Sequence, residues 1–252
     1  MNWIAKLEEL RKAGIPVVSV TVCNYKGSTP REIGAKMLVY ADGRFDGTIG
    51  GGNLEAIALK DAANVFKEGV SKSITYPLGA KTGQCCGGSV DLLFELLNTE
   101  PRLYLFGAGH VGKAVCQTLE GTPFRVHLID DREEWIHAPD LPKDTVRHAC
   151  EWMDFVAEAS WDAEKTYVAV MTHRHDLDQD IIADVVRRPA KYVGLIGSDS
   201  KWKRFQQRLA AKGFKENELA RVKCPIGVSK AGKAPKEIAV HFASEILQVH
   251  HA

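Results

Sequence analysis

Three glycines constrain the fold of this chain more than any other feature. Gly107, Gly109 and Gly112 have the spacing G-x-G-x-x-G, directly after the apolar run 103–106 and before the helical pattern 111–119. Between a strand and a helix, such glycines allow a tight turn, and they direct amide N–H groups and the helix dipole at a phosphate. The loop therefore predicts a phosphate or pyrophosphate site, although tight packing alone would also explain the glycines.

Apolar runs on both sides of this loop alternate with helical segments. The runs cover residues 103–106, 126–129, 145–149, 167–171 and 192–196. Short runs of this kind are typical of strands buried on both faces of a parallel sheet. Such a sheet usually has the strand order 3-2-1-4-5, which makes the first and fourth strands neighbours. We therefore expect residues 102–252 to form a Rossmann-like, doubly wound parallel-sheet domain.

Polar side chains are expected around the ligand crevice of this sheet. Asp130 follows the second run, where a ribose-binding acid is found in dinucleotide sites. His173 and His175 follow the fourth run and would border the same crevice as His110. Imidazoles there suit metal ligation, proton transfer or substrate binding, but also plain hydrogen bonds to backbone carbonyls. Asp178 nearby would equally serve as a helix cap.

The first part of the chain has a different pattern, that of an α+β domain over residues 1–98. The expected elements are helices near 4–10 and 54–67, strands at 17–23, 73–78 and 90–96, and a hairpin over 36–49. Asn53 is the expected N-cap of the longer helix. The polar, proline-containing segment 98–101 separates the two domains.

Two adjacent thiols distinguish this first domain. Gln84, Cys85 and Cys86 lie between glycines at positions 83, 87 and 88. Thiolates bind soft metals and accept sulfur, and glycines let a bulky ligand approach the backbone. Two cysteines without a second ligand pair do not make a zinc site, and both would also pass as small buried apolar side chains. The pair predicts contact with a soft metal or sulfur, with burial as the alternative.

Two further places in this domain suit an anion. Arg31 lies in a Ser-Thr-Pro-Arg turn and offers a planar guanidinium, and the glycines at 50–52 would present free amides at a helix start. Turn chemistry alone also explains both.

Composition excludes several classes of partner. The 33 Lys and Arg residues balance 32 Asp and Glu residues, so no net field favours nucleic acid or an anionic membrane. No apolar run is long enough to span a bilayer, and the six cysteines are too scattered for a secreted disulfide framework. We expect a cytoplasmic protein with reduced thiols.

Several motifs in one order resemble a known family, the XdhC/CoxI group of accessory proteins for xanthine dehydrogenase and related molybdoenzymes. In the first domain they are GSTPR at 27–31, GAKM at 34–37, GTIGGG at 47–52 with Glu55, and GQCCGG at 83–88. In the second domain they are residues 105–112, 172–178, 196–198 and CPIG at 224–227. The resemblance covers nearly the whole chain.

The resemblance implies a non-catalytic chaperone that binds the molybdenum cofactor (molybdopterin), supports its sulfuration by a cysteine desulfurase, and delivers it to the apo-enzyme. It also implies a homodimer that meets the nucleotidyltransferase acting on the same cofactor. On this hypothesis Cys85 and Cys86 contact molybdenum or transient sulfur, and the glycine loop holds the phosphate end. The main alternative is an NAD(P)-dependent oxidoreductase, for which no Tyr-x-x-x-Lys pair is present. A nucleotide sensor is a third possibility.

Overall fold

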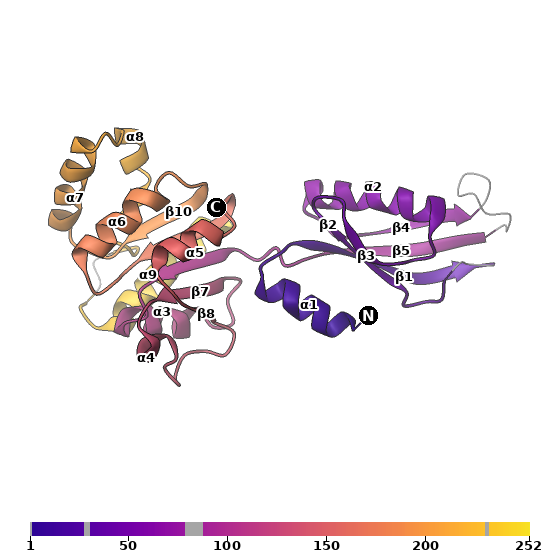
Figure 1. Cartoon of the computed structure of the whole chain (residues 1–252), viewed down its shortest axis with the longest axis horizontal. Helices are drawn as coiled ribbons and strands as arrows, with labels where there is room; N and C mark the ends of the chain where they lie inside the picture. Colours follow the sequence, from indigo (N-terminus) through magenta and orange to yellow (C-terminus); the bar gives the residue numbers. More distant parts are fainter. Residues whose placement is uncertain (1, 28–30, 79–87, 230–231) are drawn as a thin grey trace. The chain divides into compact units, whose positions relative to one another are not determined.

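The computed structural model covers residues 1–252 and describes residues 2–27, 31–78, 88–229 and 232–252. The chain divides into two compact units, Met1–Thr99 and Glu100–Ala252 (Figure 1). The predicted site residues Gln84, Cys85 and Cys86 lie outside the described residues. Within the described part, no helix is both long and apolar enough to cross a bilayer.

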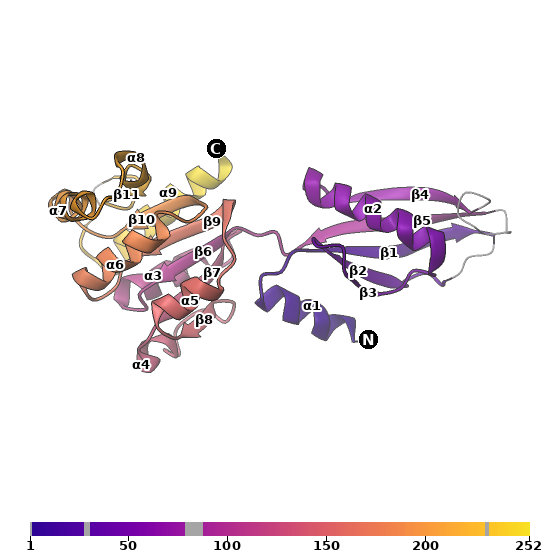
Figure 2. The same ribbon diagram turned by 45° about the horizontal axis from the view of Figure 1, so that its top comes forward.

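The first unit is an antiparallel sheet with two helices packed on it (Figure 2). Its elements are α1 (Trp3–Lys12), β1 (Val17–Lys26), β2 (Lys36–Tyr40), β3 (Phe45–Gly47), α2 (Gly52–Glu68), β4 (Lys72–Leu78) and β5 (Gly88–Leu97). The strand order is β3-β2-β1-β5-β4, and every described pair is antiparallel. The expected α+β fold of this unit is confirmed.

Alternation along β1 explains why this sheet carries a helix on each face. Successive strand residues point to opposite faces. Val18, Val20 and Val22 are fully buried in the core that includes the apolar side of α2. Val17 points the other way, into a smaller cluster with Leu10 of α1. Gly69 has φ +71° and ends α2 in the left-handed conformation that glycine adopts at low cost.

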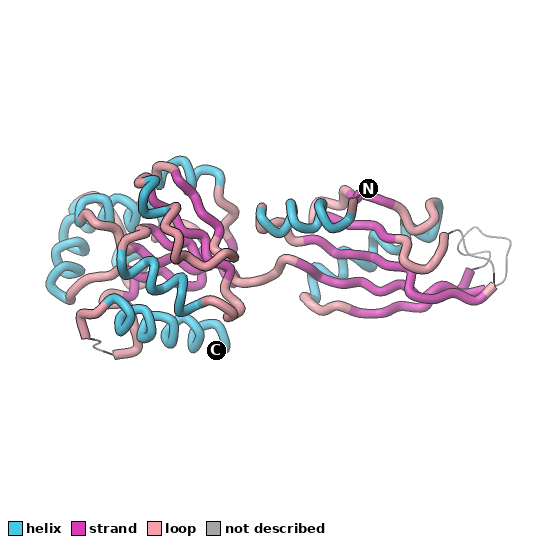
Figure 3. Tube along the Cα trace, turned by 90° about the horizontal axis from the view of Figure 1, so that it is seen from below, coloured by secondary structure: helices cyan, strands magenta, loops and turns pink. Residues whose placement is uncertain are grey.

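The second unit is a six-stranded parallel sheet with helices on both faces (Figure 3). Its elements are β6 (Arg102–Phe106), α3 (His110–Leu119), β7 (Arg125–Asp130), α4 (Glu133–Ile136), β8 (Val146–Ala149), α5 (Trp152–Glu158), β9 (Asp162–Val170), α6 (His175–Val185), β10 (Ala190–Leu195), α7 (Asp199–Ala211), α8 (Glu216–Leu219), β11 (Val222–Lys223) and α9 (Pro235–His251). The strand order is β11-β10-β9-β6-β7-β8. The Rossmann-like fold and the predicted order 3-2-1-4-5 are confirmed, and β11 extends the sheet by one short strand.

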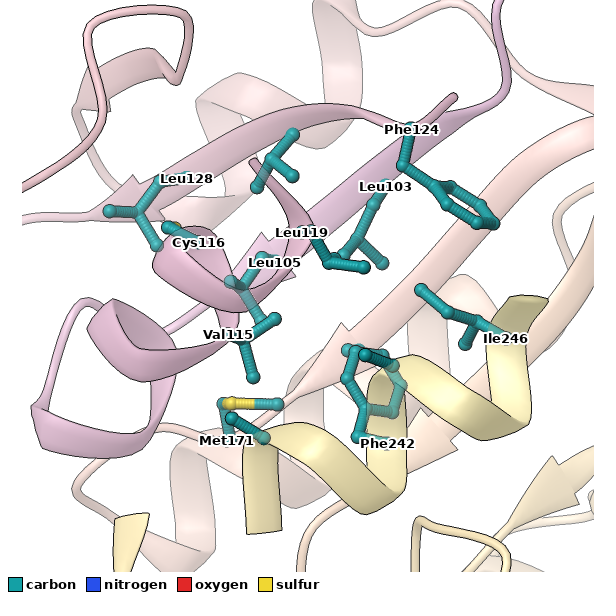
Figure 4. Close-up of a cluster of buried hydrophobic side chains, with 14 of the residues drawn as sticks. Leu103, Leu105, Val115, Cys116, Leu119, Phe124, Leu128, Met171, Phe242 and Ile246 are labelled. Carbon is teal, nitrogen blue, oxygen red and sulfur yellow. The ribbon is translucent and has the colours of Figure 1, made fainter. Parts of the chain in front are cut away.

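Two hydrophobic clusters sandwich this sheet because its central strands are apolar on both sides. One cluster joins β6 and β7 to α3 and α9, with Val115, Leu119, Phe242 and Ile246 facing one another (Figure 4). The other joins the opposite sheet face to α5, α6 and α7. The central strand β6 is buried at all its positions. The carboxyl ends of β6 and β9 are thereby held side by side, in register from Arg102–Thr166 to Phe106–Val170.

A pair of histidines, one buried and one half-buried, lies on the second of these faces. The Nδ1 atom of His127 on β7 is 3.0 Å from the Nε2 atom of His148 on β8, and the two rings are stacked. His127 is 6% exposed and contacts the ring of Tyr104 edge-on. Burial, reinforced by the charges of His148 and two arginines, lowers the pKa of His127 to about 3. Burial also lowers the pKa of His148.

We expect the second unit to lose stability on acidification. Because the pKa of His127 is about 3 in the folded protein and 6.5 for an unperturbed histidine, only the unfolded chain takes up this proton between those limits. Stability therefore falls as the pH drops below 6.5, by up to ~1.4 kcal/mol per pH unit for this group. Urea unfolding of His127→Phe between pH 7 and pH 5 should show a shallower dependence than the wild type. His137→Gln changes an exposed histidine and should keep the pH dependence of the wild type. Equal slopes for the two variants would contradict the role of His127 in the acid sensitivity.

Candidate functional site

The glycine loop after β6 is shaped by close backbone contacts. Gly107 has φ +112°, and a Cβ atom there would lie 2.4 Å from the carbonyl oxygen of Met171. A Cβ on Gly112 would lie 1.9 Å from the carbonyl oxygen of Gly107, whereas a Cβ on Gly109 would meet nothing within 4 Å. Gly107 and Gly112 are thus required by packing, and Gly109 leaves open space at the start of α3. The loops after β6 and β9 face each other, as predicted.

Asp130, the predicted ribose-binding acid, holds this loop from the end of β7. Its carboxylate accepts hydrogen bonds from the Ala108 amide at 2.7 Å and from the Arg132 amide at 3.1 Å. It also accepts two from the Arg132 guanidinium, at 2.8 Å each. Burial alone would raise the pKa of this carboxyl, but these hydrogen bonds hold it below the usual value. With a side chain only 3% exposed, Asp130 positions the loop rather than reaching outward.

A cleft lies at the carboxyl ends of β6, β7 and β9, and we call it the switch-point cleft. Its empty space is about 320 Å³, including the part open to solvent. Among the side chains that line it are Phe106, Asp130, Asp131, Glu151, Trp152 and His173. Carboxylates accept hydrogen bonds, so the cleft suits a flat ligand that carries N–H or O–H donors. It lies where ligands bind in doubly wound folds.

A second cavity, the basic pocket, lies at the carboxyl ends of β9 and β10. Side chains that line it include Thr172, His173, His175, Asp178, Lys201 and Arg204. Thr172 and His173 line both cavities, so the two adjoin. The Lys201 ammonium donates to Asp178 at 2.6 Å, and both side chains are almost fully buried. Lys201 and Arg204 therefore give this cavity a cationic lining, unlike that of the switch-point cleft.

The predicted histidines occupy different places. His173 and His175 are exposed, and their rings make no hydrogen bond to the described residues. The predicted bonds to backbone carbonyls are thus not seen there. His110 begins α3, and its ring packs edge-on against Trp135 at 5.1 Å. Its side chain turns toward α4, so it is not among the residues that line either cavity. Of the predicted glycines, only Gly107 reaches the switch-point cleft.

The expected anion site at the start of α2 is occupied by a carboxylate of the protein itself. Glu55 accepts hydrogen bonds from the amides of Ile49 at 3.1 Å and Gly51 at 2.9 Å, and from the Thr48 hydroxyl. Burial raises the pKa of Glu55, but these donors outweigh it and lower the value. The amides of Ile49 and Gly51 are therefore not free, and the N-cap is Gly51 rather than the predicted Asn53.

The described parts of the family motifs in the first unit nevertheless lie at one end of its sheet. β1 ends at Lys26, which pairs with Ser89 near the start of β5. β4 ends at Leu78, which pairs with Gly88, so both chain ends that flank residues 79–87 lie there. The GAKM segment begins β2 and the GTIGGG segment follows β3 at the same end. A Cβ on Gly88 would lie 2.2 Å from the Lys26 carbonyl oxygen, which explains that glycine.

Thiols and metal ligands are sparse in the described part of the chain. Cys23, Cys116, Cys150 and Cys224 are free thiols. No group of three or more His, Cys, Asp or Glu side chains among the described residues is placed to hold a metal ion. The predicted metal ligands Cys85 and Cys86 lie outside those residues. Cys150 lines the switch-point cleft, where burial and nearby carboxylates raise the pKa of its thiol.

Sequence reasoning missed most of the side chains that give the two cavities their character. Asp131, Glu151 and Trp152 follow β7 and β8, so their position after apolar runs was the available signal. Lys201 and Arg204 lie on α7, three residues apart and hence on one side of the helix. Nothing in the local sequence separates them from ordinary surface cations.

Comparison with known proteins assigns both units. The family model for the XdhC Rossmann domain matches residues 103–246, and the model for the XdhC and CoxI family matches residues 10–77. A crystal structure from Bacillus halodurans, described as a xanthine dehydrogenase, superposes with a TM-score of 0.53 at 20% identity. It covers 100% of this chain and 96% of its own. That likeness supports the fold.

Curated relatives match along the chain. YqeB of Escherichia coli (strain K12), named as uncharacterized, is 30% identical over 99% of this chain but 46% of its own length. PaoD of the same strain, named as a molybdenum cofactor insertion chaperone, is 26% identical over 96% of this chain and 86% of its own length. A protein of Bacillus subtilis (strain 168), named as a probable subunit of xanthine dehydrogenase, is 27% identical over 64% of this chain. The chain spans about half the length of YqeB and of the Bacillus subtilis protein, 46% in each case. On these matches the chain belongs to the XdhC and CoxI family, as the sequence motifs predicted.

Proposed function

We propose that this protein binds the molybdenum cofactor, supports its sulfuration and delivers it to xanthine dehydrogenase or a related molybdoenzyme. The observation that carries the proposal is the match with PaoD over 96% of this chain, because PaoD is named as a molybdenum cofactor insertion chaperone. In this proposal the protein is a homodimeric carrier rather than an enzyme. A cysteine desulfurase supplies the sulfur, and the carrier meets the nucleotidyltransferase that acts on the same cofactor.

The two units suit different parts of such a cargo. A pterin carries N–H donors and an aromatic face, which match the carboxylates and Trp152 of the switch-point cleft. We assign the organic end of the cofactor to this cleft, with Gly107 and His173 of the predicted residues in contact with it and His175 in the adjoining cavity. Asp130 and Gly112 would act indirectly, by shaping the glycine loop. We assign the molybdenum and its incoming sulfur to Cys85 and Cys86, with Gln84 beside them, because thiolates are soft ligands and sulfur acceptors.

Replacing both Cys85 and Cys86 by Ala should remove most of the bound cofactor. The protein would be produced in a molybdenum-replete host, and molybdenum and oxidised pterin would be measured per purified chain. Since soft thiolate contacts would be lost, we expect at least a tenfold fall, about 1.4 kcal/mol or more of binding free energy. Cys23→Ala, which removes an exposed thiol from β1, is the matched control and should retain cofactor. Equal retention in both variants would refute the thiol role.

The carrier proposal itself has a separate test. The wild-type chain should purify with substoichiometric or full molybdenum and pterin, and it should increase the activity of molybdenum-free xanthine dehydrogenase. A chain that neither carries nor transfers cofactor would overturn the proposal.

A second candidate, an NAD(P)-dependent oxidoreductase, rests on the Rossmann-like fold and its glycine loop. Asp130 argues against it, because its carboxylate already accepts four hydrogen bonds and is nearly inaccessible to a ribose hydroxyl. Calorimetry with NAD and NADP decides between the candidates, since tight binding with substrate-dependent reduction would favour the enzyme.

A further inference from the structure

The basic pocket holds a buried lysine that is not fully used by the protein. Lys201 is 6% exposed, and its Nζ atom donates to Asp178 at 2.6 Å and to the Ile196 carbonyl at 2.9 Å. An ammonium carries three N–H donors, and these two are its hydrogen bonds to described residues. The side chain also lines the cavity. A buried donor of this kind is stabilised when an acceptor enters the cavity.

Asp178, the carboxylate in the lining of this pocket, is already engaged. One of its oxygens accepts from the Thr172 amide at 3.0 Å and from its hydroxyl at 2.7 Å, and the other accepts from Lys201. Asp178 therefore neutralises Lys201 and presents little further charge to an occupant. Arg204, also in the lining, makes no ion pair with the described residues and donates only to the Ser200 carbonyl at 3.3 Å. Its guanidinium supplies the uncompensated positive charge.

Two helices begin at this pocket, and each carries acidic side chains in its first turn. α6 starts at His175 and α7 at Asp199, after adjacent parallel strands β9 and β10. Asp176 in α6 and Asp199 in α7 offset the partial positive charge of these helix ends, so the positive charge of the pocket comes from its side chains. Ser198 uses its hydroxyl to accept from the Lys201 amide, which shapes the first turn of α7. His173 and His175 provide further donors at the rim.

The adjoining switch-point cleft has the opposite character. Asp131 and Glu151 line it together with Asp130, and among the described residues only Asp130 of these three is paired with an arginine. Like charges within a few ångströms repel, so a phosphate is disfavoured in that cleft and favoured in the basic pocket. The Ala108 amide of the glycine loop, in turn, already donates to Asp130.

We propose that the basic pocket binds the phosphate group of a phosphorylated heterocyclic ligand whose ring system lies in the switch-point cleft, with His173 between the two. Lys201 and Arg204 are the phosphate donors. This deepens the proposed function by moving the phosphate end of the cargo from the glycine loop to the loops after β9 and β10. It rests on the proposed function only for the identity of the ligand.

Calorimetric titration of the full chain with inorganic phosphate and with cytidine monophosphate tests this site. Arg204→Gln should weaken the binding of both by roughly tenfold, as expected for one charge-assisted contact. Lys203→Gln removes the same charge from the adjacent position of α7, outside the cavity lining, and should change neither affinity. Equal losses in the two variants would mean a diffuse charge effect and would overturn the site.

Two further variants show where each part of the ligand binds. Asp131→Asn should alter the affinity for cytidine monophosphate but not for inorganic phosphate, because only the ester reaches the switch-point cleft. If the two ligands respond alike, the link between the cavities is wrong. If phosphate affinity falls in Gly109→Ala and not in Arg204→Gln, the phosphate lies on the glycine loop instead. Cofactor retention in the Cys85 and Cys86 variant is measured separately, so either proposal can fail alone.

Discussion

Replacing Asp178 by Asn is expected to destabilise the second unit by roughly 3–5 kcal/mol, because it leaves the ammonium of Lys201 buried without a counter-charge. The two side chains are 1% and 8% exposed, and their charged atoms are 2.6 Å apart. Burying an unpaired charge costs much more than losing a surface ion pair. Urea unfolding followed by tryptophan fluorescence reports on this unit, since four of the five tryptophans lie in it.

A nearby exposed pair provides the control. Arg174 donates to Asp176 in the same loop, but the two side chains are 58% and 65% exposed. Asp176→Asn should leave the unfolding midpoint nearly unchanged, since water and salt screen this pair. The double variant Asp178→Asn/Lys201→Met should recover most of the lost stability, because it removes both buried charges together. If Asp178→Asn is as mild as Asp176→Asn, the pair is solvated in solution and the interpretation is wrong.

The fold of the second unit could be predicted because its signals are local. Each short apolar run marks a strand, each amphipathic segment marks a helix, and the order of the strands follows from the handedness of the crossovers. The glycine spacing indicates the turn after β6, and Gly107 and Gly112 make the backbone contacts that such glycines permit. The Ser198 cap can also be predicted, since a serine before a helical pattern commonly accepts a hydrogen bond from a first-turn amide.

The character of the site could not be predicted in the same way, because it depends on strands that are neighbours only in space. Lys201 is 23 residues from Asp178, and the two meet because β9 and β10 pair in parallel. Likewise, His127 and His148 resemble ordinary strand residues until the pairing of β7 and β8 places one ring on the other. A single sequence does not report such contacts.

One wrong expectation had a local cause. From sequence alone, the glycines at 50–52 suggest an open anion site and Asn53 a helix cap. Glu55 lies in the first turn of α2, where an acidic side chain is attracted by the helix dipole and by unpaired amides. A carboxylate at that spacing competes with any external anion. The first turn of α3, by contrast, carries no acidic residue, so no carboxylate of that helix covers its first amides.

Replacing Gly112 by Ala is expected to prevent the second unit from folding, with a loss of more than about 4 kcal/mol. A Cβ atom there would lie 1.9 Å from the Gly107 carbonyl oxygen, and both groups belong to backbone that cannot rotate away. Relief would require α3 to move off β6, which would open the core around Val115 and Leu119. We expect little soluble protein, or a fluorescence transition at much lower urea concentration.

Gly109→Ala is the matched variant in the same loop, because its Cβ would meet nothing within 4 Å and its φ of −64° suits alanine. Its unfolding midpoint should therefore stay close to that of the wild type. A large loss in Gly109→Ala would mean that the loop has another conformation in solution. If Gly112→Ala instead folds normally, the close packing of α3 on the glycine loop is wrong. Because Gly109→Ala is expected to fold, any change in its ligand affinity measures how closely a ligand approaches the start of α3, free of any effect on stability.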